Sequence, residues 1–229
     1  SSQRDGSVSH ENKIKNSIIQ IESVDFRFDD SENYIFKNLN LSIQENTHNL
    51  ILGPNGSGKS TLIGLITGFH IPNSGSIKVG SEKFGYVGPV PLIFTDSLEN
   101  NLTYGIEDVE IEKDLLLDYL NKLQVFEKID SDILNIEVST KSLSSGQMQK
   151  ISFIRAFLRN PDILFLDEAI SNIDKNSIEI ILTQIDKFEG TVFNITHNPE
   201  TFKERNKIFR IEDKKLNELN IKWKNMTYL

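Results

Sequence analysis

A glycine-rich loop between two apolar runs carries most of the chemical information in the sequence. The apolar runs, residues 49–52 and 62–66, predict a strand before the loop and a helix after it. Glycines let the backbone wrap around a phosphate chain, so that successive N–H groups point inward, and the helix adds the positive end of its dipole. The loop consists of Gly53, Pro54, Asn55, Gly56, Ser57, Gly58, Lys59, Ser60 and Thr61. We expect these residues to bind the phosphates of a nucleotide.

Two side chains at the end of this loop can supply more than backbone contacts. Lys59 offers a fixed positive charge for the β- and γ-phosphates, and the Ser60 hydroxyl can ligate Mg²⁺. The alternative is an ordinary glycine-rich turn, because the pattern GxxxxGK[ST] also occurs by chance. The predicted strand and helix that flank the loop favour the phosphate site.

A pair of acidic residues follows another apolar run far downstream. Residues 163–166 are continuously apolar, which is typical of a strand that is buried on both faces. Carboxylates at the carboxyl end of such a strand lie where ligands bind in α/β sheets. We expect Asp167 to hold Mg²⁺ directly or through water, and Glu168 to orient or deprotonate the water that attacks the γ-phosphate. The two acids could instead cap the next helix.

A short serine- and glycine-containing segment lies between these two site elements. It consists of Leu143, Ser144, Ser145, Gly146 and Gln147, and a helix is predicted over residues 145–158. Small residues and a hydroxyl at a helix N-terminus form an anion cradle. Because one nucleotide does not need two cradles from one chain, we expect this segment to complete the site of another subunit. The alternative is a simple N-cap, for which Ser144 or Ser145 is well suited.

The apolar pattern along the rest of the chain predicts an α/β fold. Strands are expected over residues 18–28, 34–43, 50–52, 76–79, 163–166 and 192–195. Helices are expected over residues 61–67 and 145–158, with a helical region over 108–129. Residues 1–16 are polar, which is typical of a linker or of a scar left by cloning, and show no signal peptide.

Length and composition narrow the possible functions. The chain has 229 residues, enough for one substantial α/β domain, and its longest apolar runs fall well short of the roughly 20 residues that a transmembrane helix needs. It has no cysteines, which excludes disulfides and fits a reducing compartment. The net charge of −8 disfavours nucleic-acid partners, since it leaves no broad basic face.

Taken in order, these segments resemble the nucleotide-binding domain of ATP-binding cassette (ABC) transporters. The resemblance extends from about residue 18 to about residue 219. Residues 53–61 are similar to the Walker A loop, and residues 163–168 to the Walker B strand with its catalytic glutamate. Residues 143–147 are similar to the family signature, with Ser145 in place of its first glycine.

Three further residues take on roles only through this resemblance. Asp174 ends a segment, residues 171–174, that is similar to the D-loop, which would face the partner's ATP together with the signature. His197 is similar to the switch histidine that contacts the γ-phosphate, and Phe28 to an aromatic residue that stacks on adenine. Without the resemblance, Phe28 could be plain core and His197 an ordinary histidine.

The resemblance implies an α/β fold. It consists of a P-loop NTPase core of the RecA-like type, an N-terminal antiparallel β subdomain and a helical subdomain inserted at about residues 90–160. The ATPase domain would span residues 17–229. It would bind ATP and Mg²⁺ and hydrolyse ATP, with Lys59, Glu168 and His197 as catalytic residues. Two such domains, identical or different, would pair head to tail.

The exporter type of this family fits best, because residues 94–102 are similar to a stretch that exporters carry. The partner would then be a transmembrane domain outside this chain, holding the ATPase at the cytoplasmic face of the cell membrane. Pro89 stands where the family usually has the Q-loop glutamine, and residues 138–142 form a shortened loop before the signature. Both regions face the membrane domain in the family.

Two other functions are alternatives to this one. Soluble ABC ATPases of DNA repair or chromosome structure separate Walker A from the signature by a long coiled coil, whereas here residues 53 and 143 are too close for one. A regulatory cassette that binds ATP without turnover is disfavoured by Glu168 and His197 and favoured mildly by Pro89. The transported substrate is not encoded in this domain.

Overall fold

The computed structural model of the chain divides into two compact units. It describes residues 5–10, 17–106, 110–170, 173–196 and 207–219. The first unit comprises Ser1–Phe84, Asp162–Asp167 and Gly190–Leu229, and the second comprises Gly85–Pro161 and Glu168–Glu189. The chain enters the second unit within β6 (Phe84–Val87). Besides the inserted region expected at about residues 90–160, the second unit therefore takes in Glu168–Glu189.

An antiparallel arrangement dominates the smaller sheet of the first unit, as the sequence predicted. Its strands are β1 (Ser7–His10), β2 (Ile19–Phe26), β3 (Phe36–Ile43) and β5 (Ser74–Val79), in the spatial order β1-β5-β2-β3. Strand β2 pairs antiparallel with both β3 and β5, whereas β1 pairs parallel with β5. Strand β1 lies inside the polar segment that was expected to be a linker.

The second sheet supplies the mainly parallel core of the first unit. Its strands there are β4 (His48–Leu52), β9 (Ile163–Asp167), β10 (Thr191–Ile195), β11 (Lys207–Glu212) and β12 (Lys215–Glu218), in the spatial order β12-β11-β4-β10-β9. All pairs are parallel except the hairpin of β11 and β12. Strands β9 and β10 are buried at every residue, because they are covered on both faces.

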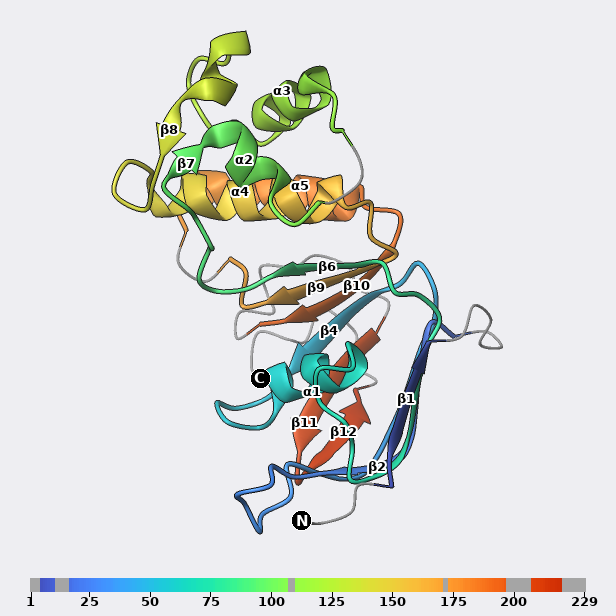
Figure 1. Ribbon diagram of the computed structural model, residues 1–229. Helices are drawn as coiled ribbons and strands as arrows, with labels where there is room; N and C mark the ends of the chain where they lie inside the picture. Colours follow the sequence, from blue (N-terminus) through green and yellow to red (C-terminus); the bar gives the residue numbers. More distant parts are fainter. Residues whose placement is uncertain (1–4, 11–16, 107–109, 171–172, 197–206, 220–229) are drawn as a thin grey trace. The chain divides into compact units, whose positions relative to one another are not determined.

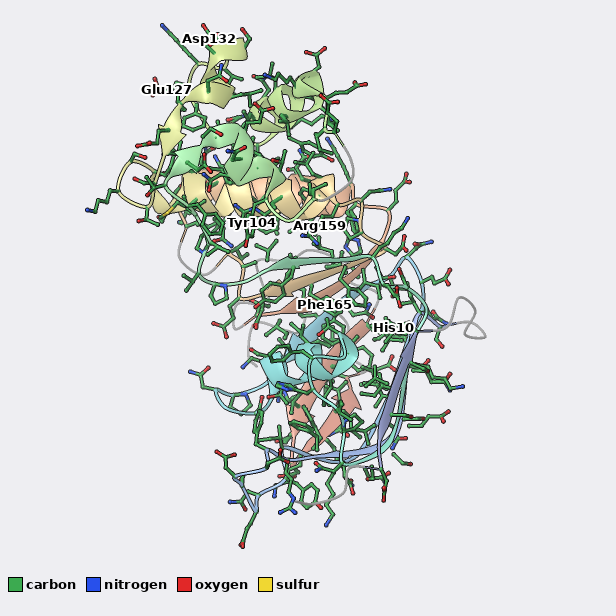
Figure 2. The ribbon with its side chains drawn as sticks, in the orientation of Figure 1. His10, Tyr104, Glu127, Asp132, Arg159 and Phe165 are labelled. Atoms are coloured by element: carbon green, nitrogen blue, oxygen red, sulfur yellow. The ribbon has the colours of Figure 1, made fainter. Side chains whose placement is uncertain are left out.

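One apolar core joins the two sheets and helix α1 (Lys59–Ile66). Figure 1 shows α1 lying over the strands of the parallel sheet. The α1 residues Leu62 and Leu65 are fully buried in the same cluster as Phe26 of β2 and Phe165 of β9, and Figure 2 shows Phe165 within the sheet. Each Å² of apolar surface buried in this core contributes about 25 cal/mol to stability. This burial holds the helix after the glycine loop in place.

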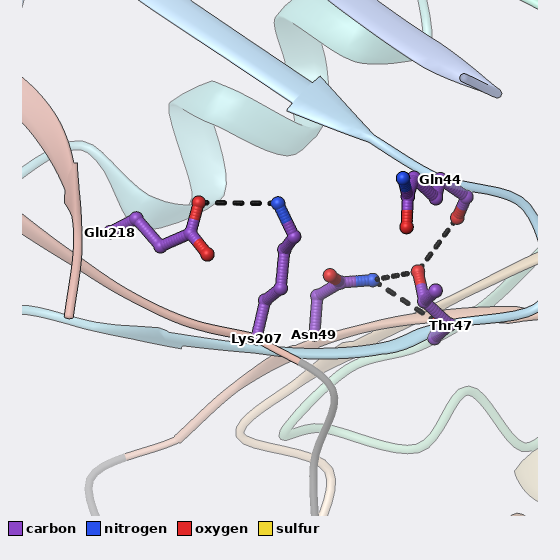
Figure 3. Close-up of polar contacts among 5 residues, drawn as sticks. All are labelled: Gln44, Thr47, Asn49, Lys207 and Glu218. Atoms are coloured by element: carbon purple, nitrogen blue, oxygen red, sulfur yellow. Dashed lines mark hydrogen bonds and ion pairs between the residues drawn. The ribbon is translucent and has the colours of Figure 1, made fainter. Parts of the chain in front are cut away.

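Polar contacts fix the turn that leads into β4 (Figure 3). The Thr47 hydroxyl donates to the Gln44 carbonyl at 2.6 Å, and the amide of the fully buried Asn49 donates to the Thr47 hydroxyl at 3.0 Å. An ion pair between Lys207 and Glu218 at 3.2 Å links β11 to β12. The strand that enters the glycine loop is thus held at its start by side chains as well as by its neighbours.

The second unit is built mainly from helices. They are α2 (Leu98–Thr103), α3 (Lys113–Lys122), α4 (Ser145–Leu158), α5 (Lys175–Asp186) and the short 3₁₀ helix η1 (Ser131–Asn135). A small two-stranded sheet pairs β7 (Asp96–Ser97) with β8 (Glu137–Val138). Helix α4 has the predicted bounds and lies beside α5 (Figure 1). Of the helical region predicted over residues 108–129, only Lys113–Lys122 is helical among the described residues.

A fully buried asparagine organises the start of the second unit. The Asn101 side chain accepts from the Phe94 backbone N–H at 2.9 Å and donates to the carbonyls of Phe94 and Ser97 at 3.0 and 3.1 Å. Its own carbonyl accepts from the Arg155 guanidinium of α4. Nearby, Arg159, which is labelled in Figure 2, donates to the Gly105 carbonyl. Asn101 therefore ties the irregular segment before α2 to the helix that follows it.

We predict that Asn101→Ala destabilises the protein by about 2–3 kcal/mol, because it leaves two Phe94 backbone groups without their partner. Urea unfolding of the variant and the parent protein measures this difference. The neighbouring Asn100→Ala is the matched control, since Asn100 is exposed and its side chain donates to the nearby Asp96. We expect it to cost less than about 1 kcal/mol. Equal losses in both variants would show that Asn101 has no special role.

Candidate functional site

The glycine loop can adopt its path only with glycine at two positions. Gly56 and Gly58 have φ angles of 77° and 101°, in the left-handed region that side chains disfavour. A Cβ atom at Gly58 would also lie 2.5 Å from Cγ2 of Ile35 and 2.9 Å from Cζ of Phe36. These glycines therefore allow the loop to close tightly in front of α1.

The lysine of the loop is buried beneath it. Lys59 is 6% exposed, and its Nζ donates to the carbonyls of Gly53 and Pro54 at 2.9 and 3.0 Å. The Ser57 hydroxyl is buried without a hydrogen-bond partner among the described residues. A buried cation and an unpaired hydroxyl within one glycine loop form a donor set that fits a phosphate chain.

A hydrogen bond joins the loop to the end of β9. The Ser60 hydroxyl, at the start of α1, donates to Oδ2 of Asp167 at 2.7 Å, although the two residues are 107 positions apart in the sequence. Asp167 is the last residue of β9 and is 7% exposed. A hydroxyl beside a carboxylate is the kind of oxygen pair that Mg²⁺ takes from protein side chains. The structure thus brings together the two residues that the sequence predicted as metal ligands.

Glu168 follows Asp167 directly and has an unusual backbone. Its φ angle is 51°, which is uncommon for a residue other than glycine, and its side chain is half-buried. Such strained residues cluster at functional sites. The predicted catalytic carboxylate therefore stands on a backbone in an uncommon, left-handed conformation.

The serine- and glycine-containing segment forms the N-terminus of α4 in the second unit. Ser144 is the N-cap, where its hydroxyl accepts from the Gln147 N–H at 3.2 Å and the Gln147 side chain accepts from the Ser144 N–H at 2.9 Å. Gln147 also donates to the Val125 carbonyl at 3.1 Å. Both Ser144 and Ser145 are exposed. Ser144 therefore caps α4, as the alternative interpretation of this segment predicts. The Ser145 side chain remains on the surface.

Asp174 lies beside this segment within the second unit. It is the N-cap of α5, where its carboxylate accepts from the Ser177 N–H at 2.9 Å and from the Ser177 hydroxyl at 2.7 Å. A Cβ atom at Gly146 would lie 2.9 Å from Oδ2 of Asp174. The structure therefore brings the predicted signature and the end of the predicted D-loop into contact. Residues 171–172 and His197 lie outside the described residues.

A pocket of about 690 Å³ opens beside the glycine loop in the first unit. Tyr34 and Ile35 line it together with Gly53, Pro54, Gly56 and Ser57 of the loop. Phe28 is not among the lining residues, because its ring packs edge-on against Phe26 and His70, with centroids 5.1 and 5.4 Å apart. Phe28 is 38% exposed. Sequence reasoning missed Tyr34, which belongs to no motif.

Comparison with known proteins identifies the family of the chain. The family model described as "ABC transporter" matches residues 36–171, more than half of the chain. The chain belongs to the ABC transporter family. No helix among the described residues has both the length and the apolar character needed to cross a membrane.

Two curated ABC relatives and one solved ABC structure show the same relationship. The ATP-dependent permease MDL1 of Candida albicans is 34% identical over 90% of this chain and 34% of its own length. A multidrug resistance ABC transporter ATP-binding and permease protein of Lactococcus lactis subsp. cremoris is 34% identical over 82% of this chain and 35% of its own length. The chain therefore spans about a third of these relatives.

The solved structure is that of a bacterial Atm1-family ABC exporter with ATP bound. It matches with a TM-score of 0.79 at 22% identity and covers 93% of this chain and 40% of that one. This likeness shows that the chain has the fold of an ABC ATP-binding cassette. The predicted fold class is therefore confirmed.

The pKa shifts near the N-termini of α4 and α5 involve Asp174 and Lys150. The hydrogen bond from the Ser177 hydroxyl lowers the pKa of the Asp174 carboxyl, with help from the Ser177 backbone and, more weakly, from Lys150. Burial lowers the pKa of Lys150, and the Asp174 carboxylate opposes this shift. Lys150 also donates to the Gln124 carbonyl at 3.1 Å. The ionised form of Asp174 is thus the form that caps α5.

This shift predicts a pH-dependent contribution to stability. Because the pKa of Asp174 is lower in the folded than in the unfolded protein, its contribution is complete above the unfolded value of about 3.9 and is lost as the pH falls below it. Asp174→Ala should cost about 1 kcal/mol at pH 7 as a lost N-cap, and less below about pH 4. Unfolding by urea at a series of pH values measures this.

Asp174→Asn is the matched control, because asparagine also caps helices but does not titrate. It should retain most of the stability at pH 7. A cost of Asp174→Ala that stays constant from pH 7 to pH 3 would contradict the assignment.

Proposed function

We propose that this chain is the ATP-hydrolysing domain of an ABC exporter, with its phosphate site at residues 53–61 and at the end of β9. The observation that carries the proposal is the Ser60–Asp167 hydrogen bond, which places the loop beside the acidic strand end. The membership of the family and the names of the relatives support the exporter assignment.

The predicted site residues divide the work of binding and hydrolysis. The loop amides and Lys59 hold the phosphates and stabilise the charge that develops on the γ-phosphoryl group. Ser60 and Asp167 would hold Mg²⁺, which neutralises phosphate charge when bound. Phe28 would contact adenine, although it does not line the pocket that contains Tyr34 and Ile35. Glu168 orients the attacking water and takes its proton, and His197 contacts the γ-phosphate.

A second ABC ATPase domain would complete each site. In the head-to-tail pair, residues Ser144, Ser145, Gly146, Gln147 and Asp174 of one domain face the ATP held by the other. The exposure of Ser144 and Ser145 supports this role, since a capped and exposed helix N-terminus can receive a phosphate. Loss of the bridging phosphate lets the pair open and drives a transmembrane domain at the cytoplasmic face of the cell membrane.

We predict that Lys59→Ala weakens ATP binding about 10- to 150-fold, because it removes a buried charge-assisted contact worth about 1.5–3 kcal/mol. Calorimetric titration with ATP measures the affinity, and steady-state phosphate release with Mg·ATP measures the turnover. Lys141→Ala, which removes an exposed lysine of the second unit, is the control and should bind normally. Unchanged affinity in folded Lys59→Ala would overturn the phosphate site.

We expect Glu168→Gln to form a dimer with ATP, because it binds the nucleotide while the step that separates the pair is blocked. Light scattering at high ATP and protein concentration measures the change from the monomer. Adding Ser145→Arg should abolish the dimer, since it places a bulky side chain in the second cradle without removing the Ser144 cap. Glu189→Gln, at the end of the second unit, is a control that should stay monomeric. If the natural pair is mixed, its partner domain must be included. A monomeric Glu168→Gln under these conditions contradicts the proposed pair.

A further inference from the structure

An exposed segment follows β6 in the second unit, and it contains the proline that replaces the family's usual glutamine. Residues 88–92 have no regular structure, and Pro89 and Val90 are exposed, Val90 to 82%. Proline has neither a backbone donor nor a side-chain ligand. The position of this segment must therefore be set by other residues.

Helix α4 holds both ends of the segment. At the first end, the Gln149 side chain donates to the Gly88 carbonyl at 3.0 Å. At the other end, the Arg155 guanidinium donates to the Leu92 carbonyl at 2.9 Å. Both side chains come from the helix that begins at Ser144 with the signature. A displacement of this helix therefore acts on the Pro89 segment at two points.

The Gln149 bond is the contact next to Pro89. Gln149 is only 3% exposed, so its amide has been taken out of water and is stabilised by this acceptor. The Pro89 nitrogen carries no hydrogen, so it cannot replace this bond with a backbone hydrogen bond of its own. A Cβ atom at Gly88 would lie 2.9 Å from the Tyr86 hydroxyl, so the backbone here is also closely approached by its own strand. The turn is thus confined between Tyr86 and Gln149.

We propose that Gln149 is a positioning residue for ATP hydrolysis, holding the Gly88–Pro89 turn in register with the signature helix. This inference rests on the proposed function. Gln149 touches no nucleotide in this role. It fixes the turn that lacks the usual glutamine, so that the turn and the signature move as one body. The simpler explanation is that a buried glutamine merely needs a partner. That explanation predicts an effect on stability and none on the ratio of kcat to KM.

The test compares Gln149→Met with the parent chain, since methionine keeps the length of the side chain and removes the donor. We expect kcat for ATP hydrolysis to fall about threefold to tenfold, the equivalent of one hydrogen bond, with KM for Mg·ATP changed less than about twofold. Amide hydrogen exchange at Val90, Leu92 and Ile93 should become faster, while exchange in β10 stays the same.

Gln184→Met is the matched control, because Gln184 is a half-buried glutamine of α5 in the same unit. It should change neither kcat nor the exchange of residues 90–93. The inference is overturned if folded Gln149→Met keeps the parent's kcat and exchange, or if kcat falls only in proportion to the fraction of folded protein. If Gln149→Met does not fold, Gln149→Asn, which keeps the amide but shortens its reach, is measured in the same way.

Position 89 provides an independent check. Since Gln149 and Pro89 act on one turn, the effect of Pro89→Gln on kcat should differ at least about threefold between the parent and the Gln149→Met background. Strictly multiplicative effects would overturn the inference. If the parent chain releases no phosphate from ATP, the proposed function fails, and the exchange measurement alone decides whether Gln149 holds the turn.

Discussion

The contact between the Ser60 hydroxyl and the Asp167 carboxylate depends on the order of the strands. Strand β4 leads into the loop that contains Ser60, Asp167 ends β9, and β10 lies between them as a parallel neighbour of both. Parallel strands direct their carboxyl ends to the same edge, so residues distant in sequence meet there. Any change that reversed one of these strands would separate the hydroxyl from the carboxylate. The site therefore exists only because the sheet is parallel at this point.

The elements that carry the predicted motifs are those that the sequence predicted best. Strand β9 is a continuous apolar run, and α4 begins at a capping serine. In the glycine loop, each residue of the motif has a physical reason for its position. Helix α5 was not predicted, although its buried Ile181 and Ile185 lie one helical turn apart. The alternation of Ile208, Phe209 and Ile211 in β11 is interrupted, which hides a strand that pairs with β4.

Other features depend on tertiary contacts that no local pattern contains. Strand β1, Ser7–His10, has few apolar residues and is a strand because β5 offers it a backbone edge. Tyr34 lines the pocket because its turn meets the glycine loop and the β11–β12 hairpin. Phe28, for which a contact with adenine stays a prediction, has its ring against His70, which follows helix α1. A motif can be recognised from the sequence alone. The direction in which a side chain of a turn points, and the residues that it contacts, depend on the fold.

Helix α4 contains both the predicted signature residues and side chains that bind other segments of the second unit. Its first turn presents exposed serines and is closed by its own capping box. It also carries the buried Gln149 and Lys150 and the half-buried Arg155, and each donates to a backbone carbonyl of another segment. Burying a polar donor is costly unless it finds an acceptor, so the bonds of Gln149 and Lys150 constrain where the helix can lie. The same helix therefore carries both the exposed first turn and the two donors that hold the Pro89 segment, Gln149 and Arg155.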